Sequence, residues 1–279
     1  MTVQLFDSVS NQCSKAVTSR YSTSFSSAIK LLHSDLHAPI YNIYGLVRFA
    51  DEIVDTFHQH DKPRLLQEFR QHTFEAIERG ISLNPILNSF QQTVNKYDID
   101  HDLIRAFFNS MESDLTESQY DRQGYEQYIY GSAEVVGLMC LYVFCNGNKE
   151  QYYSLEPSAR ALGAAFQKVN FLRDVKADFN ELSRTYFPNC NFANFTQRDK
   201  SVIEADIEAD FKLAYSGILH LPPKARFGVY IAYKYYHSLF RKIKLVKPTQ
   251  ILQSRIRIAN HHKALIVLKA GFRNQLRLI

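Results

Sequence analysis

Turn-forming residues are scarce along this chain, and their scarcity limits the folds that it can adopt. The 279 residues include only 10 Gly and 8 Pro, and apolar residues make up 46% of them. Between the turn signals lie long runs in which apolar residues recur at the spacing of one helix face. Such a chain has enough apolar surface for a sizeable core. We therefore predict an all-α protein in which residues 1–279 form one helical domain.

The periodic runs end at short stretches of turn-forming residues. Examples are Asn84-Pro85, Asn146-Gly147-Asn148 and Leu221-Pro222-Pro223. We find neither a repeat of fixed period nor a low-complexity linker between the runs. The predicted helices lie near residues 8–30, 38–58, 62–80, 84–96, 100–112, 123–146, 149–155, 157–178, 198–218, 222–244 and 248–274.

The cysteines and the apolar stretches bear on where the protein works. Cys13, Cys140, Cys145 and Cys190 include no CxxC pair, and no secretory signal peptide precedes them. Unpaired thiols of this kind are typical of a reducing compartment, so we expect a cytoplasmic protein. We find no stretch of the roughly 20 consecutive apolar residues that a membrane-spanning helix needs.

Positive charge is concentrated in one segment. Residues 241–279 contain ten Lys or Arg and no Asp or Glu. One interpretation is a solvated basic helix face, and the other is attraction to an anionic membrane surface or an anionic substrate. A nucleic-acid partner is not expected, because the sequence contains no zinc-finger, RNP-like or basic-zipper pattern.

The stretch RFADEIVD, residues 48–55, places acidic side chains on an otherwise apolar helix. At 100° per residue, a stripe about 80° wide collects Tyr41, Tyr44, Arg48, Asp51 and Asp55. Like charges four residues apart destabilise a helix slightly, and the cost grows if the face is buried. Either this stripe faces solvent, or it lines a polar cavity in which a cation lies between the acids.

A second stretch, AFQKVNFLRDVKADF at residues 165–179, repeats this design. A stripe of similar width collects Gln167, Asn170, Asp174 and Asp178, and an apolar face opposite it collects Ala161, Ala165, Val169 and Leu172. Each stripe thus carries two Asp residues four positions apart, with Arg48 or Arg173 close to its acids.

Paired carboxylates on two helices predict a metal site. Mg²⁺ prefers oxygen ligands and often bridges carboxylates to substrate phosphates. If the two helices face each other, four Asp side chains could hold Mg²⁺ around a diphosphate, and Arg48 and Arg173 could bind phosphate oxygens. An exposed ion-pair face is the alternative for either motif alone, but two matched pairs favour the metal site.

The motifs together resemble those of the squalene and phytoene synthase family of head-to-head prenyltransferases. RFADEIVD resembles the first aspartate-rich motif of the family. FQKVNFLRDVKADFNELSRTYFP, residues 166–188, resembles the second motif with its Arg184-Thr185-Tyr186-Phe187-Pro188 trailer. Three further resemblances, in chain order with these two over about residues 22–263, are YSTSFSSAIKLL (21–32), YIYGSAEVVGLM (128–139) and YHSLFRKI (236–243).

The resemblance implies a single isoprenoid-synthase domain of helices around a central cavity. Enzymes of the family join two prenyl diphosphates at C1 through a cyclopropylcarbinyl diphosphate. Within the family we expect Mg²⁺-dependent condensation of two geranylgeranyl diphosphates to phytoene, for carotenoid biosynthesis. Mn²⁺ could replace Mg²⁺, and NADPH is not expected. Because the product is a hydrocarbon, the resemblance also implies a peripheral membrane location and a downstream carotenoid desaturase as a partner.

The resemblance also assigns roles to individual residues. The implied metal ligands are Asp51, Asp55, Asn170, Asp174 and Asp178. Arg48 and Arg173 would contact diphosphate. Further implied substrate contacts are Ser22, Ser24, Phe25, Tyr41, Tyr128, Gln167 and Tyr236. Ala133 and Gly137 would open space for a prenyl chain, although small residues also simply allow helices to pack closely.

Two positions depart from the family pattern. Glu134 stands where the family usually has Gly, and its carboxylate could either narrow the cavity or face away from it. Thr23 stands where many relatives have a basic residue between the two serines, so diphosphate binding there could be weaker.

Three alternatives to phytoene synthesis stay open. The first is a dehydrosqualene or squalene synthase that uses farnesyl diphosphate, and the second is a terpene cyclase of the same fold. The third is a catalytically silent helical binding or assembly protein that keeps the fold. The four intact aspartates argue against the silent protein.

Overall fold

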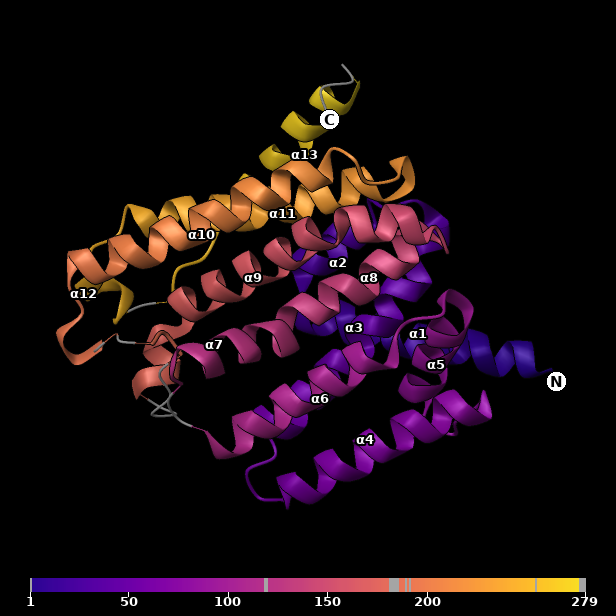
Figure 1. The fold of residues 1–279 in the computed structure, drawn as a ribbon. Helices are drawn as coiled ribbons and strands as arrows, with labels where there is room; N and C mark the ends of the chain where they lie inside the picture. Colours follow the sequence, from indigo (N-terminus) through magenta and orange to yellow (C-terminus); the bar gives the residue numbers. More distant parts are fainter. Residues whose placement is uncertain are drawn as a thin grey trace.

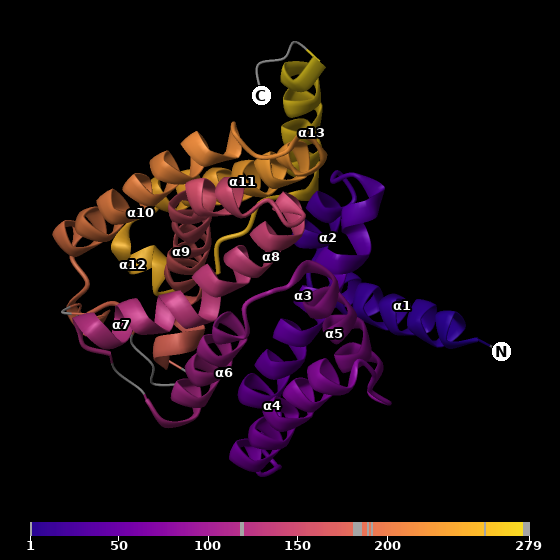
Figure 2. The ribbon, with the colours of Figure 1, turned by 45° about the vertical axis from the view of Figure 1, so that its right-hand side comes forward.

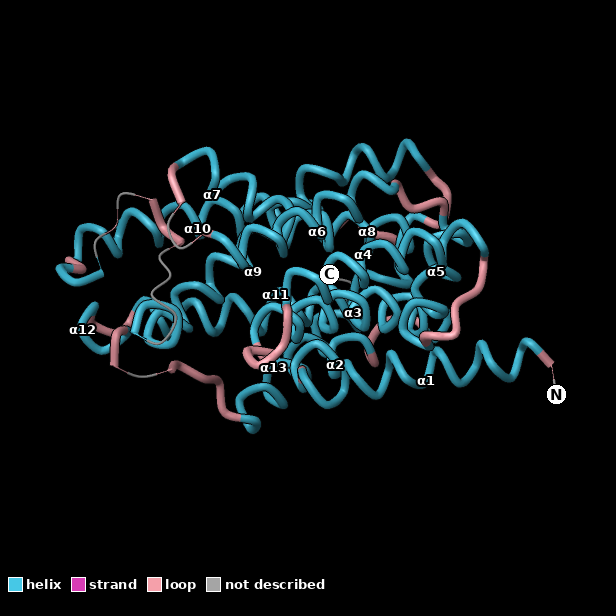
Figure 3. Tube along the Cα trace, turned by 90° about the horizontal axis from the view of Figure 1, so that it is seen from below, coloured by secondary structure: helices cyan, strands magenta, loops and turns pink. Residues whose placement is uncertain are grey.

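The computed structural model describes residues 2–117, 120–180, 186–188, 190, 192–253 and 255–275. Figure 3 shows helices joined by loops, and the described residues contain no strand. The all-α prediction is therefore confirmed. Cys13, Cys140, Cys145 and Cys190 are free thiols, as expected.

Most helices begin and end close to the positions that the turn chemistry predicts. The helices are α1 (Val3–Tyr21), α2 (Thr23–Ile29), α3 (Ser34–Asp55), α4 (Lys62–Arg79), α5 (Pro85–Tyr97), α6 (His101–Thr116), α7 (Arg122–Ile129), α8 (Val135–Cys145), α9 (Lys149–Asn180), α10 (Gln197–Ile218), α11 (Pro223–Lys244), α12 (Pro248–Ile251) and α13 (Asn260–Gln275). A π-helical turn, η1 (Tyr130–Glu134), connects α7 to α8, and a short 3₁₀ turn, η2 (Phe192–Asn194), precedes α10.

The structure corrects two predicted helices that are in fact broken. The helix predicted at 8–30 breaks at Ser22, whose backbone is extended and whose hydroxyl accepts a hydrogen bond from the Phe25 N–H at 3.3 Å. A serine in this position caps the following helix, so α2 starts afresh. The helix predicted at 248–274 is divided into α12 and α13, because residues 252, 253 and 255–259 adopt no helix.

Two other helical runs are continuous in the structure. The helices predicted at 149–155 and 157–178 form one continuous helix, α9, which runs through Pro157. The helix predicted at 123–146 is continuous in space, but the Val135 N–H donates to the Tyr130 carbonyl five residues back. Such a π-turn inserts one extra residue and rotates the faces of the helix that follows it.

α9 lies at the centre of the helix arrangement. It packs against α10 on one side and against α8 and η1 on the other, and α11 also contacts it. α1, α3 and α5 pack together beyond α8, and in Figure 2 α1 projects away from this group toward the N-terminus. The apolar stripe predicted for α9 is buried, because Ala165, Val169 and Leu172 are each 0% exposed.

The run Arg122–Cys145 is long and apolar enough to cross a membrane by length and composition, although no such run was expected. Half of its most apolar 18-residue stretch is buried inside the protein, and its π-turn interrupts the regular helix. Burial against α6 and α9 therefore accounts for its apolar composition.

Glycine allows η1 and α9 to approach each other. A Cβ on Gly163 would meet the Ala133 carbonyl oxygen at 2.7 Å and the Glu134 Cα at 3.0 Å. Neither neighbour is the end of a flexible side chain, so the backbones themselves would have to separate. This contact fixes the position of η1, which carries residues of the central cavity described below.

We predict that Gly163→Ala destabilises the protein by about 1–3 kcal/mol, because the added methyl overpacks the contact between η1 and α9. Thermal and urea unfolding would measure the loss. The matched control is Gly271→Ala in α13, where a Cβ meets nothing within 4 Å. The control should be neutral or stabilising by up to about 1 kcal/mol, because alanine favours helix. Equal stability of the two variants would contradict the close contact.

Candidate active site

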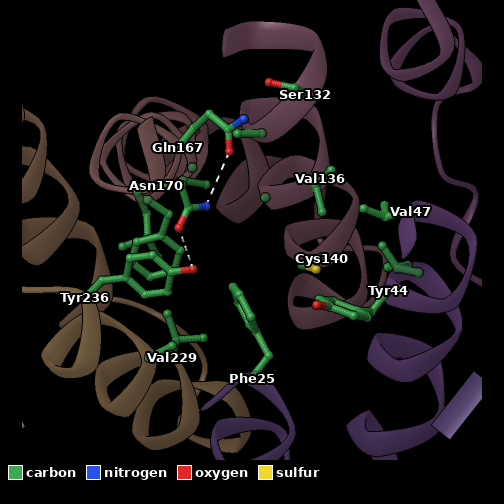
Figure 4. A pocket seen from close by; sticks show the side chains of 18 of the residues that line it. Phe25, Tyr44, Val47, Ser132, Val136, Cys140, Gln167, Asn170, Val229 and Tyr236 are labelled. Carbon is green, nitrogen blue, oxygen red and sulfur yellow. Dashed lines mark hydrogen bonds between the residues drawn. The ribbon is translucent and has the colours of Figure 1, made fainter. Parts of the chain in front are cut away.

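A cavity of about 610 Å³ lies among α2, α3, α8, α9 and α11 (Figure 4). Along α9 its wall extends from Leu155 to Asp174, which corresponds to about 28 Å of helix. Charged and amide side chains line the cavity near Asp174, whereas the α9 residues toward Leu155 that line it are mostly small or apolar. The cavity thus has a polar end and a long apolar end.

The first acidic motif lies at the polar end. Asp51 and Asp55 on α3 both line the cavity, as predicted. Arg48 also lines it and lies 3.8 Å from the Asp51 carboxylate through its Nη1. Glu52 was not predicted from the sequence. Its carboxylate forms an ion pair with Arg48 and so neutralises part of the guanidinium charge. The Arg48 Nε atom is buried without a hydrogen-bond partner among the described residues.

Burial and the neighbouring acids of this motif raise the pKa of Asp51. Burial and, after it, the neighbouring Asp55 carboxylate raise this pKa to about 7 against the opposing effect of Arg48. Asp114 on α6 adds to the same negative field. A buried carboxylate in such surroundings is stabilised by any cation that enters the cavity.

Tyr41 is not part of this site. Its side chain is 2% exposed and lies in the apolar core, and it does not line the cavity. The cavity-facing residues of α3 span an arc of about 140° that ends at Arg48, and Tyr41 lies about 20° beyond that edge. The predicted stripe was therefore correct for Tyr44, Arg48, Asp51 and Asp55 but one position too wide.

The second acidic motif lies on α9 at the same end of the cavity. Gln167, Asn170, Arg173 and Asp174 all line the cavity, as predicted. The Arg173 Nε donates to the Asp174 carboxylate at 3.0 Å. The side chain of Asp178 lies outside the described residues, as do Arg184 and Thr185 of the predicted trailer.

Arg255 is a residue of the polar end that sequence reasoning missed. It lies in the segment between α12 and α13, and its Nε is 2.8 Å from the Asp174 carboxylate. Its side chain is half exposed, so it can move aside or reach a ligand. Apart from the general basicity of residues 241–279, no sequence signal marks it, because a single arginine in a loop forms no motif.

Four aromatic rings lie next to the polar end. Phe166 and Tyr236 stack with their centroids 3.9 Å apart, and Phe25 lies 5.8 Å from Tyr236 and 5.6 Å from Tyr44. Figure 4 shows Phe25, Tyr44 and Tyr236 around the cavity. The Tyr236 hydroxyl donates to the Asn170 side-chain oxygen at 3.3 Å, and the Asn170 amide lies 3.5 Å from the Gln167 oxygen. Phe25 and Tyr236 were predicted, whereas Phe166 was not.

Ser22 and Ser24, both predicted substrate contacts, do not line the cavity. The Ser22 hydroxyl is used to cap α2, and it also hydrogen-bonds Tyr44. Burial raises the pKa of Tyr44 to about 12, against the opposing effect of that hydrogen bond. Ser22 therefore supports a cavity residue, and Ser24 lies on the short helix α2.

Tyr128 lines the cavity as predicted, but its hydroxyl donates to the Asp114 carboxylate at 2.7 Å. Burial and the neighbouring Asp114 charge raise the pKa of Tyr128 well above its ordinary value. Asp114 also lines the cavity and was missed. The sequence does contain a signal for Asp114. This residue falls between Leu103 and Phe107 on the apolar stripe of α6, where a buried carboxylate is costly and therefore indicates a functional or paired group.

The π-turn η1 and the first turn of α8 contribute small residues to the cavity wall. Ala133 and Gly137 line the cavity, and so does Ser132, whose buried hydroxyl has no partner among the described residues. Gly137 also permits close packing, because a Cβ there would meet the Ala159 carbonyl oxygen at 3.1 Å. Gly137 thus both lines the cavity and allows close packing, while space for a prenyl chain stays a prediction.

Glu134, which stands where the family usually has Gly, faces away from the cavity and does not narrow it. Its carboxylate accepts a hydrogen bond from the Arg160 Nε at 2.6 Å, and the Arg160 guanidinium lies over the Tyr130 ring. Glu134 thus ties η1 to α9 on the outer side and does not narrow the cavity. Thr23, the other departure, is exposed at the start of α2.

The polar end is chemically suited to Mg²⁺ or Mn²⁺, although the described residues do not form a complete cage. No three His, Cys, Asp or Glu side chains among them are close enough to hold a metal by themselves. The cavity is lined by the oxygen donors of Asp51, Asp55, Asn170 and Asp174, which suit these hard cations. Mg²⁺ commonly completes its shell with water and substrate phosphate. The residues present therefore fit two half-sites that a diphosphate would join.

Comparisons with known proteins agree with this geometry. A family model for squalene/phytoene synthases matches residues 18–262. A phytoene synthase from Arthrospira platensis is 25% identical over 256 residues, which cover 82% of each chain. A 4,4'-diapophytoene synthase from Staphylococcus haemolyticus is 24% identical over 198 residues, covering 68% of this chain and 66% of the relative. The chain belongs to the squalene/phytoene synthase family and is a prenyltransferase.

Solved structures show the same fold. A dehydrosqualene synthase in complex with a ligand superposes with a TM-score of 0.81 over 96% of this chain and 98% of the other, at 17% identity. Squalene synthase HpnC from Alicyclobacillus acidocaldarius superposes with a TM-score of 0.76 over 91% of this chain and 98% of the other, also at 17% identity. The predicted isoprenoid-synthase fold is thus confirmed.

We predict that Asp51→Asn stabilises the metal-free protein above pH 7. The raised pKa of Asp51 favours its protonated form in the folded state, so wild-type stability falls as the pH rises from about 4 to 7. The variant lacks this loss and should gain about 1–2 kcal/mol at pH 8, a value reduced from the full shift because the side chain is 32% exposed.

Urea unfolding in EDTA at pH 4.5 and pH 8 would measure the effect. The matched control is Glu112→Gln, which removes an exposed carboxylate that pairs with Arg70 and should change stability by less than about 0.5 kcal/mol at either pH. An Asp51→Asn variant that is less stable than wild type at pH 8 would show that the ionised carboxylate does not destabilise the folded protein.

Proposed function

We propose that this protein is a Mg²⁺-dependent phytoene synthase that condenses two geranylgeranyl diphosphates. The observation that carries the proposal is the shape of the cavity. Acidic residues from α3 and α9 line the same cavity, and small and apolar residues line its long remaining part. A substrate with a diphosphate head and a long hydrocarbon tail matches both ends. Phytoene synthases from Arthrospira platensis and Solanum lycopersicum are among its relatives, at 25% and 27% identity.

The side chains of the polar end would bind the diphosphate and its metal ions. Asp51, Asp55, Asn170 and Asp174 would hold Mg²⁺, together with Asp178, which the resemblance adds. Bound Mg²⁺ would stabilise the negative charge that develops on the departing diphosphate. Three arginines would provide hydrogen-bond donors for its oxygens, and these are Arg48, Arg173 and Arg255.

The ion pairs seen at the polar end would exchange for substrate contacts. Arg173 and Arg255 both bind the Asp174 carboxylate, which must be released to serve as a metal ligand. Once Asp174 binds a metal ion, both guanidinium groups become available to phosphate. The same two arginines can thus balance the charge of the Asp174 carboxylate before binding and the charge of the diphosphate afterwards.

The aromatic rings next to the polar end would stabilise the carbocation. Breaking the C1–O bond of the first substrate leaves an allylic cation, which the second substrate captures to form a cyclopropylcarbinyl diphosphate with loss of a proton. Phe25, Phe166 and Tyr236 line the cavity, and their ring faces that are free of stacking would contact this cation. Ring faces attract a cation without forming a bond to it. The second ionisation, rearrangement and proton loss would give phytoene without NADPH.

A farnesyl-based reaction is the second candidate. The relatives include a 4,4'-diapophytoene synthase, and the structural neighbours include dehydrosqualene and squalene synthases. The same acids and rings would serve that reaction, and only the depth of the apolar chamber would differ. A silent binding protein of this fold is disfavoured, because Asp51, Asp55 and Asp174 are intact and face the cavity.

The hydrocarbon product also motivates a proposal about location and partners. Phytoene is insoluble in water, so the enzyme would work peripherally at the cytoplasmic face of a membrane. A carotenoid desaturase that consumes phytoene would be its neighbour there. The basic character of residues 241–279 supports attachment to anionic lipid.

Product analysis tests the proposed function. Purified protein would be incubated with Mg²⁺ and either farnesyl or geranylgeranyl diphosphate, with and without NADPH, and the hydrocarbons would be identified by mass spectrometry. We expect C40 phytoene from geranylgeranyl diphosphate, unaffected by NADPH. A C30 product as the main outcome would favour the farnesyl-based reaction. No coupled product from either substrate would refute both.

We predict that two substitutions at the polar end slow diphosphate release by different amounts. Asp174→Asn removes a metal ligand and should reduce the rate by at least about 100-fold. Arg255→Gln removes one phosphate donor and should reduce it by about 10- to 100-fold. The control is Lys224→Gln, which breaks an exposed ion pair with Asp35 and should stay within about twofold of wild type.

A coupled phosphatase assay of released diphosphate would measure all three variants. An unchanged rate for Arg255→Gln would mean that Arg255 serves only to pair with Asp174 before the metal binds. An unchanged rate for Asp174→Asn would contradict the proposed metal site itself.

A further inference from the structure

The outer face of α13 exposes large apolar side chains. Ile266 and Ala270 are 8% and 3% exposed and lie in the hydrophobic core, where α13 packs on α11. On the other side, Leu265, Leu268 and Phe272 are 49%, 69% and 64% exposed. At 100° per residue these three fall within about 60°. In Figures 1 and 2 α13 stands at the edge of the molecule, beyond α11.

Cations border this apolar stripe. Lys269 and Arg273 are exposed and lie on the helix next to Leu265, within about 80° of it. Residues 241–279 contain no acidic residue, so nothing in the surrounding segment offsets their charge. A contiguous exposed apolar stripe on a globular protein marks an interaction surface. An apolar stripe beside basic residues is typical of a helix that lies in a membrane interface.

The charge decides which occupant fits best. A second copy of this chain on the same face would place two basic helices against each other, which is repulsive. A neutral lipid surface would use the apolar stripe but leave the cations without partners. An anionic lipid surface accepts the apolar side chains and pairs the cations with headgroups, at a gain for each basic residue near the surface.

We propose that α13 is the membrane-docking helix of this protein, with Leu265, Leu268 and Phe272 inserted between anionic lipids and Lys269 and Arg273 bound to their headgroups. The inference deepens the membrane location proposed above, on which it rests. It does not depend on whether the enzyme uses C15 or C20 substrates, because α13 contributes no side chain to the cavity.

Docking through α13 would bring the apolar chamber close to the membrane. α13 packs on α11, and Val229 and Ala232 of α11 line the cavity. Val229 is visible at the cavity wall in Figure 4. One helix would therefore separate the lipid surface from the chamber that holds hydrocarbon tails, whereas Arg255 and the acids lie at the other, polar end.

Vesicle flotation of the full chain tests this inference. The vesicles would contain phosphatidylcholine alone or with 30% phosphatidylglycerol. We expect binding to the anionic vesicles only, weakened by salt. Leu268→Ser/Phe272→Ser and Lys269→Gln/Arg273→Gln should each weaken binding by at least about tenfold, since both apolar contact and charge contribute.

Matched controls separate α13 from the rest of the surface. Leu83→Ser removes an apolar side chain that is 92% exposed elsewhere, and Arg198→Gln/Lys212→Gln removes two exposed cations of α10. Both controls should bind vesicles like wild type. All variants should keep the wild-type melting temperature and the wild-type rate of diphosphate release in detergent, which distinguishes a failed docking surface from a failed enzyme assignment.

Three outcomes would overturn the proposal. Wild-type protein that binds neutral and anionic vesicles equally, or binds neither, would exclude anionic lipid as the occupant. α13 variants that bind like wild type would place the contact elsewhere. A dimer in sedimentation velocity that the α13 variants abolish would assign the stripe to a second copy of the chain.

Discussion

The balance of charge at the polar end of the cavity is the constraint on which the rest of the site depends. Carboxylates from α3, α6 and α9 converge there, and burial raises the pKa of Asp51 to about 7. Two arginines from the same helices and one from the segment after α12 offset them. Such an arrangement is costly in an empty cavity and becomes favourable when cations enter with an anionic substrate. The proposed binding of metal and diphosphate would offset this cost.

The cavity separates two kinds of chemistry along α9. Ion pairs and amides lie near Asp174, small and apolar residues line the wall toward Leu155, and the rings of Phe25, Phe166 and Tyr236 lie near their junction. A long helix gives this separation, because one face can present different residues over about 28 Å. Its other face packs against neighbouring helices.

Segments that lack a motif of their own complete the site. The π-turn η1 brings Ser132 and Ala133 to the cavity, while Glu134 ties the same turn to Arg160 outside it. The basic segment after α11 contributes residues both to the cavity end and to the outer surface. Arg255 reaches inward to Asp174, and α13 presents cations and apolar side chains outward. One charged segment thereby connects the substrate end of the enzyme to the proposed membrane surface.

The sequence by itself determined the helical class, the two acidic stripes and most of their apolar backs, because the spacing of residues along a helix is a local property. It also identified Tyr236, Tyr128, Ala133 and Gly137 as cavity residues. Only the tertiary structure decided that Tyr41 lies in the core, that Glu134 faces outward, and that Asp114, Phe166 and Arg255 join the site. Periodicity fixes where a residue lies around its own helix. The rotation of each helix and the neighbours brought to it from distant segments follow from the packing of all the helices together.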